Sequence, residues 1–326
     1  MRLLDKIEPL LLLAAVGLGV ALSGLPWIAA PAARLVSVFL ACMLFGLFWE
    51  APLRDIGRGF RNVRFTLTSL AVNFIWTPFF AWILMGAFMG DSPYLALGLL
   101  LLLVTPCTDW YLVFTGISRG NVPLSTAILP VNLIAQVALL PVYILVYSGV
   151  RGEISALLLA KSAVLTLAVP FALAKGIKLA LAGRGRPAAI MEGLFARRQF
   201  AWLWLAVAAM FASERIFAGG YLSVFARITL PVLVFFAATF LVARAASRAA
   251  RLDFPDSVSL TFTALARNSP LALAFAQRAF PENREVLLPL VIGPLLELPI
   301  LALLSQVILA MGARAASRAA RTTADP

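Results

Sequence analysis

The sequence contains no histidine, only two cysteines (Cys42 and Cys107), and charged residues at just 13% of its 326 positions. Zinc sites and disulfide frameworks are built from clusters of His and Cys, so neither can organise this chain. No nucleophile–base pair or metal-ligand cluster is recognisable either, which argues against an enzyme. The low charge stands beside 62% apolar residues, a composition that excludes a soluble domain with a single core.

What the sequence does contain is a series of long apolar runs, each near the length of about 20 residues that crosses a bilayer as a helix. We therefore predict an all-α polytopic membrane protein with ten transmembrane helices. The first run is interpreted as a retained helix rather than a signal peptide, because it is long enough to span. The predicted spans are residues 9–28, 33–52, 66–89, 93–118, 122–148, 154–174, 199–217, 221–243, 257–279 and 286–311.

Lys and Arg are distributed unevenly over the predicted loops. Arg34, Arg151, Arg215, Arg278 and Arg284 fall on one side, Lys161, Arg227 and Arg267 fall within spans, and all others fall on the opposite side. Because Lys and Arg are enriched in cytoplasmic loops, we predict a multi-pass protein of a bacterial-type inner membrane with both termini in the cytoplasm. The net charge of +12 then reflects topology rather than a nucleic-acid-binding surface. The arginine-rich segment 53–65 suits an interfacial helix or, equally, a charged loop.

Two predicted helices carry polar interruptions that a continuous lipid-facing helix would not tolerate. The fourth is interrupted at residues 105–109 (TPCTD) and the ninth at residues 267–270 (RNSP), with Pro106 and Pro270 as the helix-breaking residues. The breaks occupy matching places in residues 1–150 and 151–326. Since five helices per half is an odd number, we predict two inverted five-helix repeats forming one membrane domain, with the interruptions of helices 4 and 9 in contact at the binding site. Lys161 and Arg227 lie near the outer helix ends, where long side chains reach the interface.

The stretch TPCTDWYLVFTGISRGN and the stretch IGPLLELPIL (Ile292 to Leu301) resemble motifs of the bile acid/arsenite (bile acid:sodium symporter-like) transporter superfamily, and within it of the arsenite-efflux permeases. FRNVRF (Phe60 to Phe65) and the spacing from Asn73 to Pro78 support this resemblance, which spans most of the chain. The resemblance implies that Cys107 is a metalloid ligand and that Glu297 is a proton-coupling carboxylate. A soft thiolate suits trivalent arsenic or antimony by analogy with other soft metals.

The sequence also departs from the superfamily pattern. Pro270 stands where the arsenite permeases carry an acidic residue, and the positions of the sodium ligands in the sodium-coupled branch hold Tyr111, Leu112 and Thr263. Asp109 replaces a small residue, and we expect it to partner Arg267 if the breaks cross, because either charge alone would be costly there. That pair could be structural, or it could serve gating or the substrate.

The resulting hypothesis is a secondary transporter that exports arsenite or antimonite from the cytoplasm by proton antiport, without a cofactor. Its substrate-binding residues would be Cys107, Thr108, Asp109, Arg267 and Asn268, with Glu297 carrying the proton. The alternative is an organic-anion transporter in which Arg267 pairs the substrate carboxylate and Cys107 is incidental. Cys42 is interpreted as a packing residue, and Asp253 and Asp256 as helix-capping residues. Sequence leaves the substrate, the coupling ion and the oligomeric state open.

Overall fold

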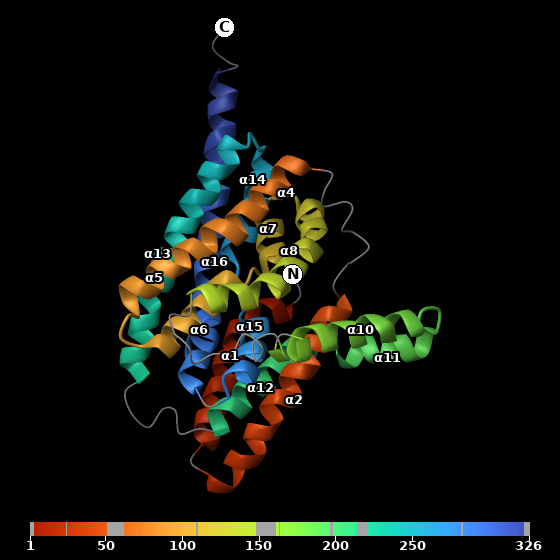
Figure 1. Ribbon diagram of the computed structural model, residues 1–326. Helices are drawn as coiled ribbons and strands as arrows, with labels where there is room; N and C mark the ends of the chain where they lie inside the picture. The colour runs from red at the N-terminus through yellow and green to blue at the C-terminus, as the bar shows by residue number, and fades with distance from the viewer. Residues whose placement is uncertain are drawn as a thin grey trace.

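The computed structural model describes residues 3–23, 25–50, 62–108, 110–147, 161–162, 164–195, 198–213, 221–281 and 283–322 (Figure 1). Regular structure in these residues is helical, apart from one isolated antiparallel bridge. The helices are α1 (Leu3–Leu22), α2 (Pro26–Glu50), α4 (Val63–Ala71), the π-helix η2 (Val72–Trp76), α5 (Thr77–Phe88), α6 (Pro93–Val104), α7 (Trp110–Ile117), α8 (Val122–Tyr147), the π-helix η3 (Val164–Ala168), α10 (Val169–Ala180), α11 (Gly185–Leu194), α12 (Gln199–Ser213), α13 (Tyr221–Ala249), α14 (Phe254–Leu265), α15 (Ser269–Ala279), the 3-10 helix η6 (Arg284–Val286) and α16 (Leu287–Thr322).

Several of these helices are long and apolar enough to cross a membrane. Within the described residues there are 5 such spans, in α2, α4 to α5, α8, α13 and α16, while α6 and α12 are shorter apolar helices. The chain is therefore an all-helical polytopic membrane protein, as the composition predicts. The boundaries differ in places: α2 begins at Pro26 rather than near 33, α13 and α16 run beyond the predicted spans, and α11 was not predicted. Most of the arginine-rich segment, residues 51–61, lies outside the described residues.

The helices pack in two groups. In one, α2 packs against α12 and α10, and α12 also packs against α1 (Figure 1). In the other, α6 packs against α5, α8 and α16, and α14 packs against α13, α7 and α4. The groups meet where α15 packs against α2 and where α1 packs against α16. Each group takes helices from both halves of the chain, so the fold interleaves the halves.

A tight contact between α6 and α16 fixes the helix that carries Glu297. Gly98 of α6 lies against the Val286 carbonyl and the Pro289 ring, and an added Cβ would come within 2.3 Å of that carbonyl oxygen. Only glycine allows these backbones to approach so closely. Gly293 of the tenth-helix motif packs against the Leu102 side chain, where an added Cβ would come within 2.5 Å of a methyl carbon.

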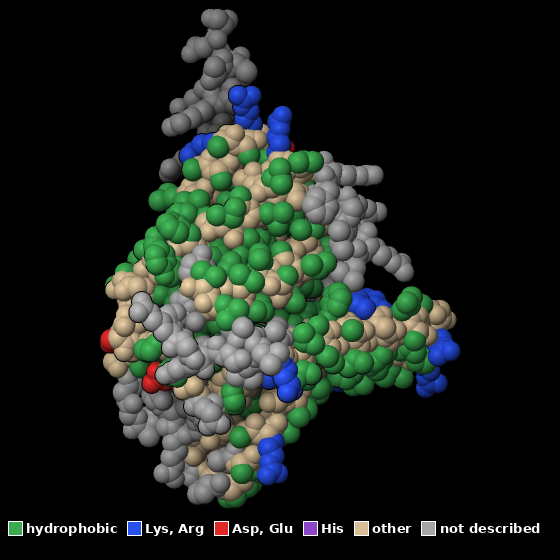
Figure 2. Space-filling view, viewed as in Figure 1, with side chains coloured by type: hydrophobic (Ala, Val, Ile, Leu, Met, Phe, Trp, Pro, Cys, Tyr) green, Lys and Arg blue, Asp and Glu red, His purple; other side chains and the backbone are tan. Residues whose placement is uncertain are grey.

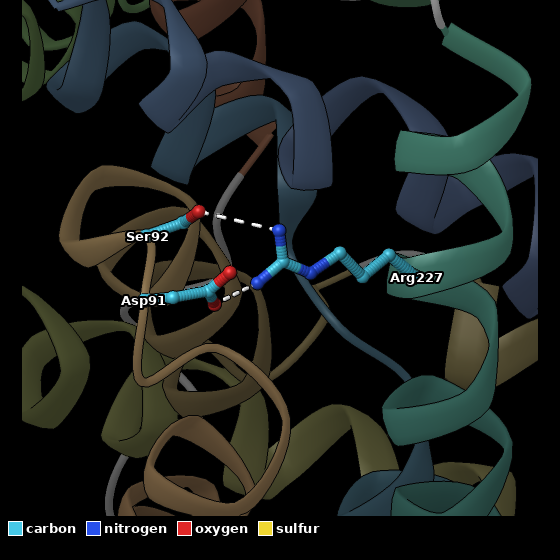
Figure 3. A network of polar contacts seen from close by, with 3 residues as sticks. All are labelled: Asp91, Ser92 and Arg227. Atoms are coloured by element: carbon cyan, nitrogen blue, oxygen red, sulfur yellow. Dashed lines mark hydrogen bonds and ion pairs between the residues drawn. The ribbon is translucent and has the colours of Figure 1, made fainter.

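The outer surface has the character expected for contact with lipid. Figure 2 shows apolar side chains over the broad face of the molecule, with Lys and Arg side chains gathered towards its margins. Arg227 of α13 is paired with Asp91 and donates to Ser92 Oγ at 3.3 Å, in the turn between α5 and α6 (Figure 3). The Asp91 side chain is 71% exposed, so this ion pair contributes little stability.

Candidate functional site

The two interruptions predicted from sequence contact each other directly. Beyond the end of α6, Thr105 is extended, and beyond the end of α14, Ala266 is extended. The Cys107 backbone N–H donates to the Ala266 carbonyl at 2.9 Å, and the Asn268 N–H donates to the Thr105 carbonyl at 2.7 Å. These bonds form the antiparallel bridge between Pro106 and Arg267. The breaks satisfy each other's freed backbone groups, which is the contact that their polarity predicts.

Side chains satisfy the helix ends that meet at this crossing. Thr105 Oγ1 donates to the Leu101 carbonyl at 2.9 Å at the end of α6. Asn268 is the N-cap of α15, because its Oδ1 accepts from the Leu271 N–H at 3.2 Å. Pro270 lies in the first turn of α15, where the missing N–H costs nothing. Pro270 therefore starts the second half of the interrupted helix.

Arg267 lies at the centre of the crossing and is only 2% exposed. Its guanidinium donates from Nη1 to the Leu103 carbonyl at 2.8 Å and from Nε to the Leu265 carbonyl at 3.1 Å. Nη2 donates to Asn73 Oδ1 at 3.3 Å and to the Ala264 carbonyl. The cation therefore caps the C-terminal carbonyls of both α6 and α14, the negative ends of two helix dipoles.

Asp109, the predicted partner of Arg267, lies outside the described residues. The groups that surround the guanidinium among the described residues are helix carbonyls, Asn73 and the ring of Phe235, whose centroid is 5.3 Å from the guanidinium carbon. The burial of this cation is thus accounted for by hydrogen bonds and a cation–π contact.

Cys107 and Glu297 are brought together through the segment Ala266–Arg267. The Arg267 backbone N–H donates to Glu297 Oε1 at 2.8 Å. The carbonyl of the preceding residue, Ala266, accepts from the backbone N–H of Cys107. Both the thiol and the carboxyl lie within electrostatic range of the Arg267 guanidinium. Glu297 is 3% exposed and Cys107 is 6% exposed.

Thr108 and Asn268 complete the group of predicted residues at the crossing. Asn268 Nδ2 donates to Thr108 Oγ1 at 3.4 Å, which ties the fourth-helix break to the ninth-helix break through side chains as well as backbone. The structure therefore places Cys107, Thr108, Arg267, Asn268 and Glu297 in one cluster.

Sequence reasoning did not assign Asn73 and Phe235 to this cluster. Asn73 lies in the π-helix η2, and short π-helical segments within α-helices are frequent at functional sites. The widened turn is stabilised by Thr77, whose hydroxyl donates to the Val72 carbonyl at 2.9 Å. A buried Asn in an apolar span was a visible signal. Phe235 gave none, because an aromatic residue in an apolar helix usually only packs.

A cavity of about 290 Å³ opens where the two helix groups meet beside α15. Ser37 of α2, Thr166 of η3, and Ala274, Gln277 and Arg278 of α15 contribute to its lining. Thr166 Oγ1 and Gln277 Oε1 are buried, and neither has a hydrogen-bond partner within the described part of the chain. The lining is therefore shared between the two groups and includes polar atoms.

The cluster gathers a thiol, a buried carboxyl, a hydroxyl and an amide around a buried cation that is stabilised by hydrogen bonds to helix carbonyls. Among the described residues, no three His, Cys, Asp or Glu side chains gather as ligands for a resident metal ion.

Comparison with known proteins identifies the family of the chain. The profile of the Sodium Bile acid symporter family matches residues 37–215, which is more than half of the chain. The chain is also 25% identical over 261 residues to the arsenical-resistance protein Acr3 of Corynebacterium glutamicum, covering 75% of this chain and 70% of that protein. The crossed helix breaks thus belong to a multi-pass secondary transporter, not an enzyme, and the chain is a member of the Sodium Bile acid symporter family.

Proposed function

We propose that this protein exports arsenite or antimonite from the cytoplasm in exchange for protons. The observation that carries the proposal is that Cys107 and Glu297 bond to two consecutive residues. The Cys107 backbone N–H donates to the Ala266 carbonyl, and Glu297 Oε1 accepts from the Arg267 backbone N–H. A soft thiol suits a trivalent metalloid, and the buried Glu297 carboxyl, bonded to the adjoining segment, can exchange a proton as the solute binds. The similarity to an arsenical-resistance protein supports the same substrate class.

Proton rather than sodium coupling is supported by the positions where the resemblance expects sodium ligands. Tyr111 is fully buried, and its hydroxyl donates to the Ser125 carbonyl at 2.5 Å. A hard cation needs several oxygen ligands, preferably with a carboxylate. Tyr111, Leu112 and Thr263 supply no carboxylate, whereas Glu297 at the crossing is available for a proton.

The proposal includes an inverted-repeat topology with both termini in the cytoplasm. The interrupted pair α6 and α7 matches the interrupted pair α14 and α15 in the other half, and each pair places two helix ends at the crossing. Inverted repeats commonly form their solute site from such broken helices. Alternating access then follows from movement of the α1–α2–α10–α12 group against the other helices.

The organic-anion alternative loses support from the surroundings of Arg267. Four of its hydrogen bonds already go to Leu103, Leu265, Ala264 and Asn73. A guanidinium that pairs a substrate carboxylate needs a free face with two parallel N–H groups. To bind an anion, Arg267 would have to release the ends of α6 and α14.

The test is Cys107→Ser, which keeps the size and hydrogen bonding of the side chain but replaces soft sulfur with hard oxygen. We expect cells of an arsenite-sensitive bacterial host that carry this variant to lose arsenite resistance, at equal expression by immunoblot. Cys42→Ser is the matched control: Cys42 lies on α2, outside the crossing, and should be silent. Full resistance with Cys107→Ser would remove the thiol mechanism, and no resistance from the unmutated protein would contradict the proposed substrate.

A further inference from the structure

Two buried amides on α8 have no hydrogen-bond partner among the residues that the structure describes. Asn132 and Gln136 are each 1% exposed. Within the described part of the chain, neither the NH₂ group nor the carbonyl oxygen of either side chain is bonded. An unpaired buried polar group is costly, and inside a membrane protein no bulk water relieves it. A pair of such groups marks a place suited to a polar occupant.

The two amides share one face of α8. At 3.6 residues per turn, Asn132 and Gln136 lie within about 20° of Ser125 and Tyr143 around the helix. On the opposite face of this part of α8, Ile134 and Leu145 are exposed. The amides therefore point into the protein rather than into lipid.

Contacts at both ends of this face lead to the crossing. At one end, Tyr111 of α7 bonds the Ser125 carbonyl, and Tyr111 is four residues beyond Cys107. At the other end, Tyr143 Oη donates to the Phe74 carbonyl at 2.9 Å, next to Asn73, which accepts from Arg267. Asn132 and Gln136 lie between these two contacts.

The direction in which α8 runs also supports placing the amides on the side of the crossing. The Arg119-Gly120 turn reverses the chain between α7 and α8, and the Gly120 N–H bonds the Thr115 carbonyl at 2.8 Å. Because α7 and α8 are packed together by this short turn, moving from Ser125 towards Asn132 runs in the direction from Tyr111 towards Cys107. Asn132 is seven residues from Ser125, a rise of about 10 Å along α8 in that direction.

We infer that Asn132 and Gln136 form a hydroxyl-binding subsite of the solute path, for a neutral solute that carries several hydroxyl groups. This inference rests on the proposed function and names what recognises the part of the solute that sulfur does not. An uncharged amide offers both a donor and an acceptor, so it matches a hydroxyl, which both donates and accepts. An anion or a metal ion would leave half of these atoms unpaired.

Binding through a single thiol leaves hydroxyl groups on the metalloid for such a subsite. When the Cys107 thiol reacts with As(OH)₃, the S–H bond and one As–O bond break, and an As–S bond and one water molecule form, with no change of oxidation state. Two hydroxyls stay on arsenic. Cys42, the other cysteine of the chain, lies on α2 in the other helix group and is not part of the crossing. The remaining hydroxyls are the groups that the amides bind, and hydrolysis by water reverses the step on release.

The test replaces each amide by an apolar side chain of similar size, Asn132→Leu and Gln136→Leu. We expect the KM for arsenite in everted vesicles to rise at least about tenfold, because bound hydroxyls lose their partners. We expect the melting temperature in detergent to stay unchanged or to rise, because an unpaired amide has been removed. Thr126→Val is the matched control on the same helix, since its hydroxyl only bonds the Val122 carbonyl at 2.9 Å, and it should leave the KM unchanged.

A second substrate separates hydroxyl recognition from a structural role. Methylarsonous acid, in which a methyl group replaces one hydroxyl, keeps only one hydroxyl after it binds the thiol. The unmutated protein should therefore prefer arsenite, and the leucine variants should lose that preference. An unchanged KM, an unchanged preference or a lowered melting temperature in both variants would overturn the inference while leaving arsenite export by the unmutated protein intact. Absence of arsenite transport by the unmutated protein would instead refute the proposed function and the inference with it.

Discussion

At the scale of single residues, the structure shows which groups surround Arg267. An intramembrane arginine is a functional candidate by default, and the sequence allowed a substrate, gating or structural role. The guanidinium holds the ends of two half-helices through three backbone carbonyls and Asn73, contacts that fit the structural role. Its charge is used to stabilise the helix breaks, and the breaks in turn place Cys107.

This role predicts that the main effect of Arg267→Met is a loss of protein stability rather than a specific loss of substrate recognition. Three buried carbonyls lose their donor, at roughly 1–3 kcal/mol each, so the free energy of unfolding should fall by at least about 3 kcal/mol. Thermal melting in detergent measures this loss. Arg227→Met is the matched control, because its ion pair with the exposed Asp91 is worth less than about 1 kcal/mol. A well-folded Arg267→Met protein that fails only in transport would favour the organic-anion alternative.

Glu297 leads to a prediction about coupling. Glu297→Gln keeps the oxygen that accepts from the Arg267 N–H at 2.8 Å but cannot exchange a proton. Arsenite uptake into everted vesicles should no longer respond to an imposed pH gradient, while arsenite should still shift the melting temperature. Uptake by the unmutated protein that collapses when choline replaces sodium, at a constant pH gradient, would contradict proton coupling.

At the scale of helices, one carboxylate joins three helix starts. Asp253 caps α14, as expected, because its Oδ1 accepts from the Asp256 N–H at 2.9 Å. Asp256, also predicted to cap, lies instead in the first turn of α14, and its two oxygens accept from Asn62 Nδ2 and Asn121 Nδ2, both at 2.8 Å. Asn62 is the N-cap of α4, and Asn121 accepts from the Leu124 N–H at the start of α8. Asp256 therefore ties α4, α8 and α14 together.

Asp256→Ala should consequently destabilise the protein more than Asp253→Ala. Loss of the Asp253 cap costs about 1 kcal/mol, whereas loss of Asp256 leaves two amides without their charged acceptor, at roughly 1.5–3 kcal/mol each. Melting temperatures of the two variants in detergent provide the comparison. Equal effects would show that Asp256 only caps its own helix.

At the scale of the whole molecule, the two helix groups predict which distances change during transport. Ser37 of α2 and Ala274 of α15 line the same cavity from opposite groups, whereas Ser37 and Thr166 line it from the same side. In a Cys42→Ser background, a short thiol crosslinker joining Ser37→Cys to Ala274→Cys should abolish arsenite uptake. The Ser37→Cys and Thr166→Cys pair is the control, and its crosslinking should leave uptake near the uncrosslinked rate. Equal inhibition by both pairs would argue against movement between the groups.

Much of the architecture follows from local sequence. Apolar runs of bilayer length predict the spans, and the polar stretches at Thr105–Thr108 and Arg267–Pro270 predict both breaks and their contact, because backbone groups freed inside a membrane protein need partners. The boundaries of α2, α13 and α16 were less well predicted. Hydropathy cannot register a helix that continues beyond the apolar span, as α13 and α16 do.

The apolar runs and polar interruptions were enough to predict a membrane transporter with two interrupted helices and to select Cys107 and Glu297 as candidate site residues. What each polar group faces depends on how the helices pack. Arg267 caps α6 and α14, Asp256 joins three helix starts, and Asn132 and Gln136 are buried without a hydrogen-bond partner in the described part of the chain. The partners of a polar side chain are set by helix packing across more than a hundred residues, and no local pattern of residues encodes them.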